Sequence, residues 1–323
     1  MSHLLEVKDL KKHFPLKRSW LGASTGRVHA VDGVSFHVER GETLSLVGES
    51  GCGKSTVGRS ILRLFDLTEG EVRLDGERID NLSPRQLRPV RQKLQVVFQD
   101  PFASLNPRLT VREALAEPIS NFESGVTSEA MQSRVDKLLD LVRLPRDAGR
   151  RYPHEFSGGQ RQRICIARAL ASKPKLVICD EAVSALDVSV KAQIVNLLQD
   201  LQDELGLALL FISHDLGIVE HMTHRVAVMY LGRIVEQGTA QRIFAAPKHP
   251  YTQALLSAAP GNAKAGKRIV LKGDVPSPVT PPQGCHFHTR CPYAFDRCRV
   301  EAPRLENQGD GHLAACHLQA LPV

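Results

Sequence analysis

Residues 48–56 decide the fold of this chain, and they read Gly48-Glu49-Ser50-Gly51-Cys52-Gly53-Lys54-Ser55-Thr56. The stretch fits the phosphate-loop pattern G-x-x-x-x-G-K-[ST] and lies between an apolar, strand-like run and a helix-like run. Glycines allow backbone N–H groups to turn toward phosphate oxygens, and the start of a helix adds a favourable dipole. Lys54 can reach the β- and γ-phosphates, and Ser55 can ligate Mg²⁺. The stretch therefore predicts a nucleotide-binding loop.

Strand-like and helix-like segments alternate around this loop. Residues 176–179 and 207–212 are short, nearly continuous apolar runs, which are typical of buried parallel strands. Residues 187–205 between them are expected to form the crossover helix, and residues 4–48 contain short alternating segments that indicate further strands. After the loop, apolar side chains recur at helical spacing at Val57, Ile61, Leu62 and Phe65. Together these segments predict an α/β fold with a mostly parallel sheet.

A pair of carboxylates supplies the second half of the expected site. Asp180 and Glu181 directly follow the apolar run at 176–179. Ligands of parallel sheets bind at the carboxyl ends of the strands, so both side chains are expected at that edge. Asp180 would hold Mg²⁺ through water, and Glu181 would polarise the attacking water. A surface acidic pair at a strand end is the alternative, and the phosphate loop weighs against it.

Composition narrows the class of protein. The chain has 323 residues, 42% hydrophobic and 24% charged, which excludes global disorder and indicates roughly two structural units. The net charge of +7 is mild and does not by itself indicate nucleic acid. No apolar run approaches the roughly 20 residues that cross a bilayer. Because the N-terminus also lacks the apolar stretch of a signal peptide, we expect a cytoplasmic chain.

Residues 156–163 make the expectation more specific. The stretch Phe156-Ser157-Gly158-Gly159-Gln160-Arg161-Gln162-Arg163 resembles the signature motif of ATP-binding cassette ATPases. The resemblance extends, in the order of that family, to Gln99 after a strand-like run, to the Ser184–Asp187 stretch and to His214. It covers residues 4–245. It implies a phosphate-loop core, an N-terminal antiparallel β subdomain and a helical signature subdomain at about residues 100–160.

The resemblance also implies roles for individual residues. Ser157, at the start of the signature helix, would face the γ-phosphate held by a second cassette, with ATP between the two subunits. In this family the positions that bind ATP, in addition to residues 48–56, correspond to Phe14, stacked on adenine, to Ser157, Gly158, Gly159 and Gln160, and to Asp187, working across the dimer. Gln99 would touch Mg²⁺ and the attacking water, and His214 would contact the γ-phosphate.

Two kinds of cassette protein carry these motifs, a transporter subunit and a soluble ATPase acting on nucleic acid or the ribosome. Repair-type cassettes insert long coiled coils between the phosphate loop and the signature, and no heptad run is present between Lys54 and Ser157. Translation-type cassettes commonly carry two cassettes in a chain, whereas this chain has one. Both features favour a transporter subunit, for which no nucleic-acid partner is expected.

The C-terminal segment identifies the transporter class by resemblance. The stretch His249–Leu256 and the cysteines resemble the extension of dipeptide and oligopeptide importer ATPases, nearest to the second ATPase of a dipeptide importer. We therefore expect a cassette at 1–245 and an extension at 246–323. Implied partners are a second, distinct ATPase subunit, two permease subunits and an extracytoplasmic solute-binding protein. The chain would be peripheral, at the cytoplasmic face of the inner membrane, and an importer of nickel or another small solute is the alternative.

Of the seven cysteines, a group gathers in this segment: Cys285, Cys291, Cys298 and Cys316. In a reducing cytoplasm such a group favours metal over disulfides. Cysteines at irregular spacing can hold zinc or an iron–sulfur cluster. The resemblance implies a 4Fe–4S cluster, with zinc or free thiols as the alternatives. The expected cofactors are thus ATP with Mg²⁺ and an iron–sulfur cluster.

Overall fold

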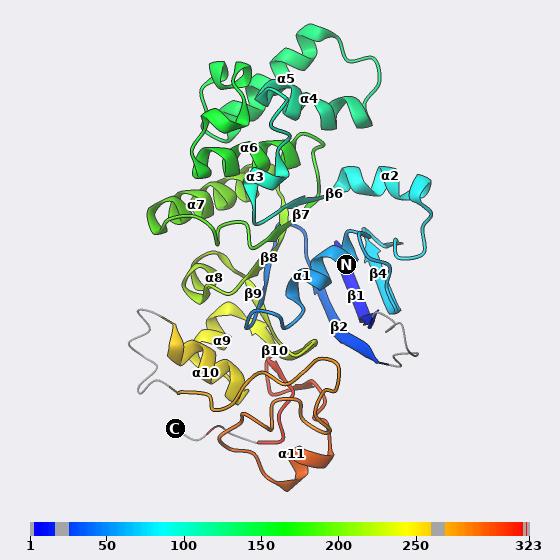
Figure 1. Cartoon of the computed structure of the whole chain (residues 1–323), viewed down its shortest axis with the longest axis vertical. Helices are drawn as coiled ribbons and strands as arrows, with labels where there is room; N and C mark the ends of the chain where they lie inside the picture. Colours follow the sequence, from blue (N-terminus) through cyan, green and yellow to red (C-terminus); the bar gives the residue numbers. More distant parts are fainter. Residues whose placement is uncertain (1–2, 17–25, 260–268, 319–320, 322–323) are drawn as a thin grey trace. The chain divides into compact units, whose positions relative to one another are not determined.

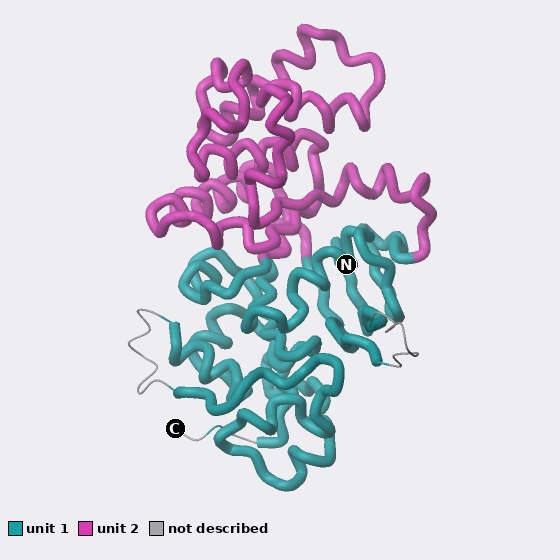
Figure 2. Tube along the Cα trace, in the orientation of Figure 1, with its two compact units in different colours: residues 1–38, 43–80, 212–323 teal, residues 39–42, 81–211 magenta. Residues whose placement is uncertain are grey.

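The computed structural model describes residues 3–16, 26–259, 269–318 and 321 (Figure 1). The chain divides into two compact units (Figure 2). The first unit contains residues 1–38, 43–80 and 212–323, and the second contains residues 39–42 and 81–211. Within the described part of the chain, no helix combines the length and the apolar character that a membrane span requires.

A small antiparallel sheet begins the first unit. Its strands lie in the order β2-β1-β4-β5, with bounds β1 Leu5–Pro15, β2 Arg27–Val38, β4 Glu69–Leu74 and β5 Glu77–Arg78. β1 is much longer than the alternating segment expected at its start. The alternation breaks at Asp9, which has φ 44° at a register shift between the strands and whose N–H donates to Ser35 Oγ (2.9 Å). Such a bulge reverses the apolar pattern and hides the continuing strand.

The first unit contains a second group of strands, in the order β11-β12-β10-β9-β3, and the phosphate loop directly follows β3. β3 is buried at every position and pairs in parallel with β9, while β9 and β10 are antiparallel. The strand bounds are β3 Thr43–Val47, β9 Arg225–Tyr230, β10 Arg233–Thr239, β11 Glu306–Asn307 and β12 Leu313–Ala314. The helices of this unit are α1 Lys54–Ile61, α8 Leu216–Met222, α9 Ala240–Ala245, α10 Pro250–Ala258 and α11 Asp296–Val300.

The second unit combines strands with most of the helices. Its strands lie in the order β8-β7-β6, and β6 pairs in parallel with β7. The bounds are β6 Leu94–Val97, β7 Leu176–Asp180 and β8 Ala208–Ser213, the last two residues of β8 belonging to the first unit. The helices are α2 Pro84–Lys93, α3 Pro101–Ser104, α4 Val111–Phe122, α5 Ser128–Leu141, α6 Gly158–Leu170 and α7 Val188–Leu205, with short 3₁₀ turns at Arg146–Arg150 and Pro153–Glu155.

Two sequence expectations can be compared directly with these elements. The crossover helix between the apolar runs is confirmed as α7, which ends at Leu205 and is followed by the C-cap residue Gly206 with φ 63°. The helix after the phosphate loop is shorter than its apolar spacing indicated. It ends at Ile61, and Arg63 has φ 54°, so Phe65 lies beyond the helix and packs edge-on against Phe14 with ring centroids 5.3 Å apart. The apolar spacing there reflects contact with β1 and not continuation of the helix.

Candidate functional site: a phosphate loop and two strand-end groups

The phosphate loop has a backbone that only glycine can supply at two positions. A Cβ atom on Gly48 would lie 2.2 Å from the carbonyl oxygen of Met229, and Gly48 has φ 152°. A Cβ atom on Gly53 would lie 2.1 Å from the carbonyl oxygen of Ala30, at φ 106°. Atoms this close cannot coexist, so both glycines allow the loop to pack against neighbouring backbone. The loop is therefore held tightly at its two ends.

The charged centre of the loop is Lys54. Its side chain is buried, and Nζ donates to the carbonyl oxygens of Gly48 (2.8 Å) and Glu49 (3.0 Å). Lys54 opens α1, whose first turn holds no acidic residue, so the positive end of the helix dipole is uncompensated there. Ser55 and Thr56 follow on the same turn and are half-buried. A lysine, a helix N-terminus and a glycine-lined backbone together form a site for anionic phosphate.

Cys52 lies inside this loop and is buried. Burial raises the pKa of its thiol, although the nearby Lys54 ammonium opposes the shift. Lys54 Nζ lies 3.8 Å from the sulfur. At neutral pH the thiol is therefore protonated and serves as a small apolar side chain.

In the second unit, three predicted residues lie at the ends of two neighbouring strands. β6 and β7 run in parallel with Val97 opposite Cys179, so Gln99 and the Asp180-Glu181 pair follow the same edge of the sheet. Asp180 is 5% exposed, Glu181 is half-buried and Gln99 is exposed. This is the carboxyl-end edge that the sequence predicted for the acidic pair.

Glu181 has an unusual backbone. Its φ is 52°, in the left-handed region that side chains other than glycine rarely adopt, and its carbonyl oxygen accepts hydrogen bonds from the N–H and the hydroxyl of Ser184 (both 3.0 Å). Ala182 follows and is buried. A glutamate kept in a strained conformation by the next turn is a feature found at functional sites, where the surrounding structure fixes the side chain's direction.

The signature residues form the start of α6. Ser157 is its N-cap and accepts a hydrogen bond from the N–H of Gln160 (3.3 Å), whose side chain in turn accepts one from the N–H of Ser157 (3.0 Å). Ser157 and Gln160 are exposed. The predicted helix start is thus confirmed as a capping box with an exposed N-terminus.

The glycines of the signature bring α6 close to the residues around Asp187. A Cβ atom on Gly158 would lie 3.6 Å from Leu186, and one on Gly159 would lie 2.4 Å from Val190. Asp187 is the exposed N-cap residue of α7. The second unit therefore places the signature residues and Asp187 side by side, at the starts of two adjacent helices.

The basic residues after the signature have structural contacts. Arg161 is buried, and it donates to the carbonyl oxygens of Pro153 (2.7 Å) and His154 (3.1 Å). Arg163 donates to the carbonyl oxygen of Val142 (3.0 Å). These bonds tie α6 to the preceding segments of the second unit. Contacts of this kind give no support to a nucleic-acid surface on this helix.

The remaining predicted ATP residues lie in the first unit. His214 follows the end of β8 and is exposed, and the next residue, Asp215, caps α8 by accepting from the N–H of Ile218 (3.4 Å). Phe14 is half-buried on β1, so part of its ring faces solvent, and Lys12 Nζ lies 4.9 Å from its ring centroid. A half-exposed aromatic ring is able to stack on a base, as predicted for Phe14.

Sequence reasoning missed two residues that touch the phosphate loop. The carboxylate of Glu49 accepts two hydrogen bonds from Arg290, and the N–H of Glu49 donates to Tyr251 Oη (2.8 Å). Tyr251 lies in the stretch that resembled the importer extension, and Arg290 directly precedes Cys291. Neither residue carries a local sequence signal of this contact, because no periodic pattern marks a contact over such a sequence distance.

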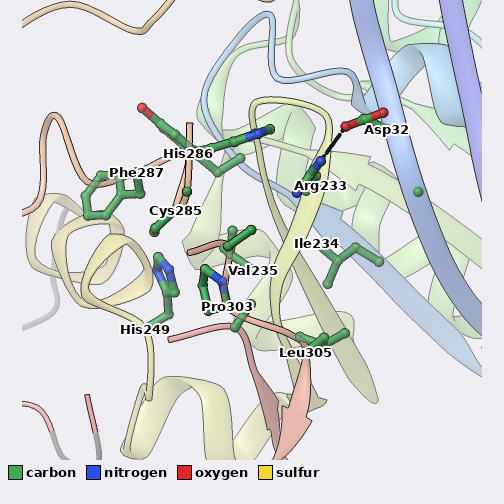
Figure 3. A pocket seen from close by; sticks show the side chains of 15 residues that line it. Asp32, Arg233, Ile234, Val235, His249, Cys285, His286, Phe287, Pro303 and Leu305 are labelled. Carbon is green, nitrogen blue, oxygen red and sulfur yellow. Dashed lines mark hydrogen bonds and ion pairs between the residues drawn. The ribbon is translucent and has the colours of Figure 1, made fainter. Parts of the chain in front are cut away.

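A cavity of about 190 Å³ lies elsewhere in the first unit (Figure 3). Strand β10 lines it with Ile234 and Val235, and the C-terminal segment lines it with Cys285, His286 and Phe287. At one edge Arg233 donates to Asp32 Oδ2 (2.7 and 3.1 Å), as Figure 3 shows. The phosphate-loop residues do not line this cavity, which belongs to the packing of the C-terminal segment on β10.

The expected iron–sulfur cluster at Cys285, Cys291, Cys298 and Cys316 is not supported. All are free cysteines, and among the described residues no three of their sulfur atoms lie within 4.8 Å of one another. The groups that do come within 4.8 Å are made of histidine and carboxylate, such as His13, His29 and Asp32. Burial raises the pKa of both Cys285 and Cys291 to about 11. Cys285 and Cys298 are neighbours in this segment, because the N–H of Cys285 donates to the carbonyl oxygen of Cys298 (2.9 Å).

Two family models match the chain. Residues 31–184 match the model described as ABC transporter, and residues 235–298 match the model described as oligopeptide/dipeptide transporter, C-terminal region. The first match contains the phosphate loop, Gln99, the signature and the acidic pair. The second contains Tyr251 and Arg290.

Curated relatives match nearly the whole chain. The "Probable peptide ABC transporter ATP-binding protein y4tS" of Sinorhizobium fredii is 55% identical over 98% of this chain and 90% of its own length. The oligopeptide transport ATP-binding protein AppF of Bacillus subtilis is 52% identical over 98% of this chain and 97% of its own length. These names describe ATP-binding proteins and mention no metal cluster.

Solved structures share the fold. The ATP-binding cassette MJ0796, determined as a dimer in a post-hydrolysis state with ADP and phosphate, is 28% identical, with a TM-score of 0.65 over 73% of this chain and 98% of that chain. CbiO1 from Clostridium perfringens, part of the ABC transporter complex cbiONQ, is 28% identical with a TM-score of 0.65 over 76% of this chain and 92% of that chain.

Proposed function

The chain belongs to the ATP-binding cassette transporter family, among the ATP-binding proteins of peptide transporters, and on that premise we propose that it hydrolyses ATP to drive peptide import. The phosphate loop carries this proposal, because its glycines, buried lysine and uncompensated helix N-terminus form a site for a triphosphate. The relatives are named for peptide and oligopeptide transport, which favours peptides over nickel or nucleic acid.

In this proposal the loop backbone and Lys54 bind the phosphates, and Phe14 stacks on the adenine. Ser55, Gln99 and Asp180 would hold Mg²⁺, and oxygen ligands of this kind suit that hard cation. Bound Mg²⁺ would neutralise charge that develops on the phosphate oxygens. Asp180 fits this role because a carboxylate that is 5% exposed is stabilised by a nearby cation.

Hydrolysis would depend on Glu181 as the residue that polarises the attacking water. The strained backbone at Glu181 supports this role, because it fixes the direction in which the side chain leaves the backbone. Gln99 would help to position the water, and exposed His214 would contact the γ-phosphate. Each of these residues follows the end of a strand, where a small change in the next turn can reposition it.

We further propose that two cassettes close on two ATP molecules. The exposed N-terminus of α6, with Ser157, Gly158, Gly159 and Gln160, would face the γ-phosphate on the partner, and Asp187 would work across the same dimer. A second, distinct ATPase subunit, two permease subunits and a solute-binding protein would complete the importer. The chain would act at the cytoplasmic face of the inner membrane.

The division of the chain is part of the proposal. The cassette would occupy residues 1–245, with a helical subdomain at about 100–160 that contacts the permease, and residues 246–323 would form the importer-type extension. The match of residues 235–298 to the transporter C-terminal model supports an extension of that type. Its cysteine-rich character would serve packing around Cys298, which is buried.

The test replaces Glu181 with glutamine and compares it with Glu204→Gln, an exposed glutamate on the last turn of α7. In purified protein, Glu181→Gln should bind ATP normally and lose turnover, whereas Glu204→Gln should hydrolyse ATP normally. In cells that lack the native copy, the Glu181→Gln chain should fail to restore uptake of a labelled dipeptide. Normal hydrolysis by Glu181→Gln would refute the catalytic role, and wild-type chain that restores no dipeptide uptake would refute the substrate.

A further inference from the structure

Glu49, in the phosphate loop, is fixed by the C-terminal part of the chain. Arg290 donates from both terminal nitrogens to the two carboxylate oxygens of Glu49, at 2.6 and 3.1 Å. This is the paired geometry in which arginine binds a carboxylate most strongly. The Arg290 side chain is 8% exposed and that of Glu49 is 30% exposed. Such an ion pair is shielded from water on the arginine side and is not a loose surface contact.

Tyr251 makes a second contact with the same residue. Its hydroxyl oxygen accepts the hydrogen bond from the N–H of Glu49 at 2.8 Å, and its side chain is fully buried. The ring is held in an aromatic cluster, 4.7 Å from Tyr230 and 5.4 Å from Phe287 between ring centroids. Tyr251 also lies in the first turn of α10. The hydroxyl that receives the Glu49 N–H is therefore positioned by rigid packing.

The remaining polar group of Glu49, its carbonyl oxygen, accepts from Lys54 Nζ at 3.0 Å. All three polar groups of one loop residue thus have a defined partner, two of them from residues after position 250. A residue bound at its N–H, its side chain and its carbonyl has little freedom to rotate. Because Lys54 is the lysine that reaches the phosphates, the position of Glu49 also affects the position of the ammonium group.

The contact between Arg290 and Glu49 also changes the charge of the phosphate loop. Glu49 carries a carboxylate within a loop whose ligand is a polyanion, and like charges in such a site repel. Arg290 neutralises that carboxylate and directs it toward the C-terminal segment. The hydrogen bond with Glu49 raises the pKa of Arg290, although burial opposes this, so the guanidinium stays charged. Without Arg290, the Glu49 carboxylate would oppose the triphosphate.

We propose that the C-terminal segment is part of the nucleotide site, with Arg290 and Tyr251 as positioning residues that hold the phosphate loop through Glu49. The inference rests on the proposed ATP-binding role of the loop. If this proposal holds, the C-terminal segment affects the affinity for ATP. Neither residue needs to contact the nucleotide, because both act through the backbone and the charge of Glu49.

The test uses the full chain with Arg290→Met and a matched control, Arg297→Met. Arg297 also forms a paired contact with a glutamate of the same segment, Glu301 (2.8 and 2.8 Å), away from the loop. Titration with a fluorescent ATP analogue should show affinity about ten-fold weaker for Arg290→Met, the lower end of the effect expected when charge-assisted hydrogen bonds are lost. KM should rise by a similar factor while kcat at saturating ATP changes less than about two-fold. Arg297→Met should match wild type.

A second pair of variants separates positioning from loss of folding. Adding Glu49→Gln to Arg290→Met removes the uncompensated charge and should recover most of the lost affinity. Tyr251→Phe removes only the hydroxyl oxygen and should weaken ATP binding with little change in the melting temperature. Equal affinity in Arg290→Met and wild type, or equal weakening by both arginine variants, would overturn the inference. Failure of the wild-type chain to bind the analogue would instead refute the proposed function of the loop.

Discussion

Acidification should destabilise the first unit through one buried imidazole, His249. Its side chain is 1% exposed, and its Nδ1 accepts the N–H of Tyr251 (3.1 Å) at the start of α10. The buried carboxylate of Glu236 accepts from the N–H of His249 (3.0 Å), and Phe287 packs against the ring. Burial lowers the pKa of His249 to about 3. In an unfolded chain the pKa of histidine is about 6.5.

Between these two pKa values, the unfolded chain binds a proton that the folded chain does not bind. The free energy of unfolding therefore decreases as the pH falls below about 6.5. At pH 5 this loss in the free energy of unfolding is about 2 kcal/mol, because each pH unit below about 6.5 contributes about 1.4 kcal/mol. At pH 7.5 the loss is close to zero. Because the folded-state pKa lies well below 5, its exact value hardly affects this figure.

Urea unfolding of wild type and His249→Asn at pH 7.5 and pH 5 measures the effect. Asparagine keeps a side-chain oxygen at the N-cap but gains no proton in this range. The variant should be less stable than wild type at pH 7.5, because the ring contacts with Phe287 are lost. At pH 5 the difference in the free energy of unfolding between the two proteins should be smaller by about 2 kcal/mol. His221→Asn, an exposed control on α8, should show no such narrowing. An identical gap for His249→Asn at both pH values would refute the reasoning.

Substitutions at three further positions test the loop and the helix ends. Gly53→Ala should abolish binding of a fluorescent ATP analogue, since its Cβ would lie 2.1 Å from the Ala30 carbonyl oxygen; unchanged affinity would contradict the loop geometry. Ser157→Ala should lower the free energy of unfolding in urea by about 1 kcal/mol through loss of the α6 cap, and Ser157→Asp should not. Gly206→Ala should lower the free energy of unfolding in the same assay by about 1 kcal/mol, because alanine is strained at φ 63° although no atom lies within 4 Å of its Cβ. An unchanged free energy of unfolding would show that the backbone there is not strained.

The sequence predicted those parts of the fold whose signals are local. The phosphate loop is recognisable because glycine is required where backbone approaches backbone, as at Gly48 and Gly53. Strand β7 is recognisable because a strand buried on both faces is apolar at nearly every position. The site residues Asp180 and Glu181 follow from that strand, since its carboxyl end fixes their edge of the sheet. In each case neighbouring residues in the chain carry the whole signal.

The sequence could not predict contacts that depend on how distant segments pack. The extent of β1 was hidden because the bulge at Asp9 reverses its alternation. The pairing of Arg290 with Glu49 joins residues 241 positions apart, and an arginine beside a cysteine carries no mark of its partner. The cysteines show a different limit, because a group such as Cys285 and Cys291 along the chain does not by itself place three sulfur atoms within 4.8 Å of one another, and no such group occurs among the described residues.

The distance along the chain between Glu49 and Arg290 also sets an order of events during synthesis. A ribosome releases the phosphate loop first, while the residues that hold Glu49 emerge 202 and 241 residues later. A nascent chain can therefore fold its early strands before its nucleotide loop has received its final supports. If those supports govern affinity as proposed, a chain cut short by premature termination or trimmed by a protease would compete poorly for ATP. Incomplete subunits would then be screened out by weak nucleotide binding before they could occupy a transporter.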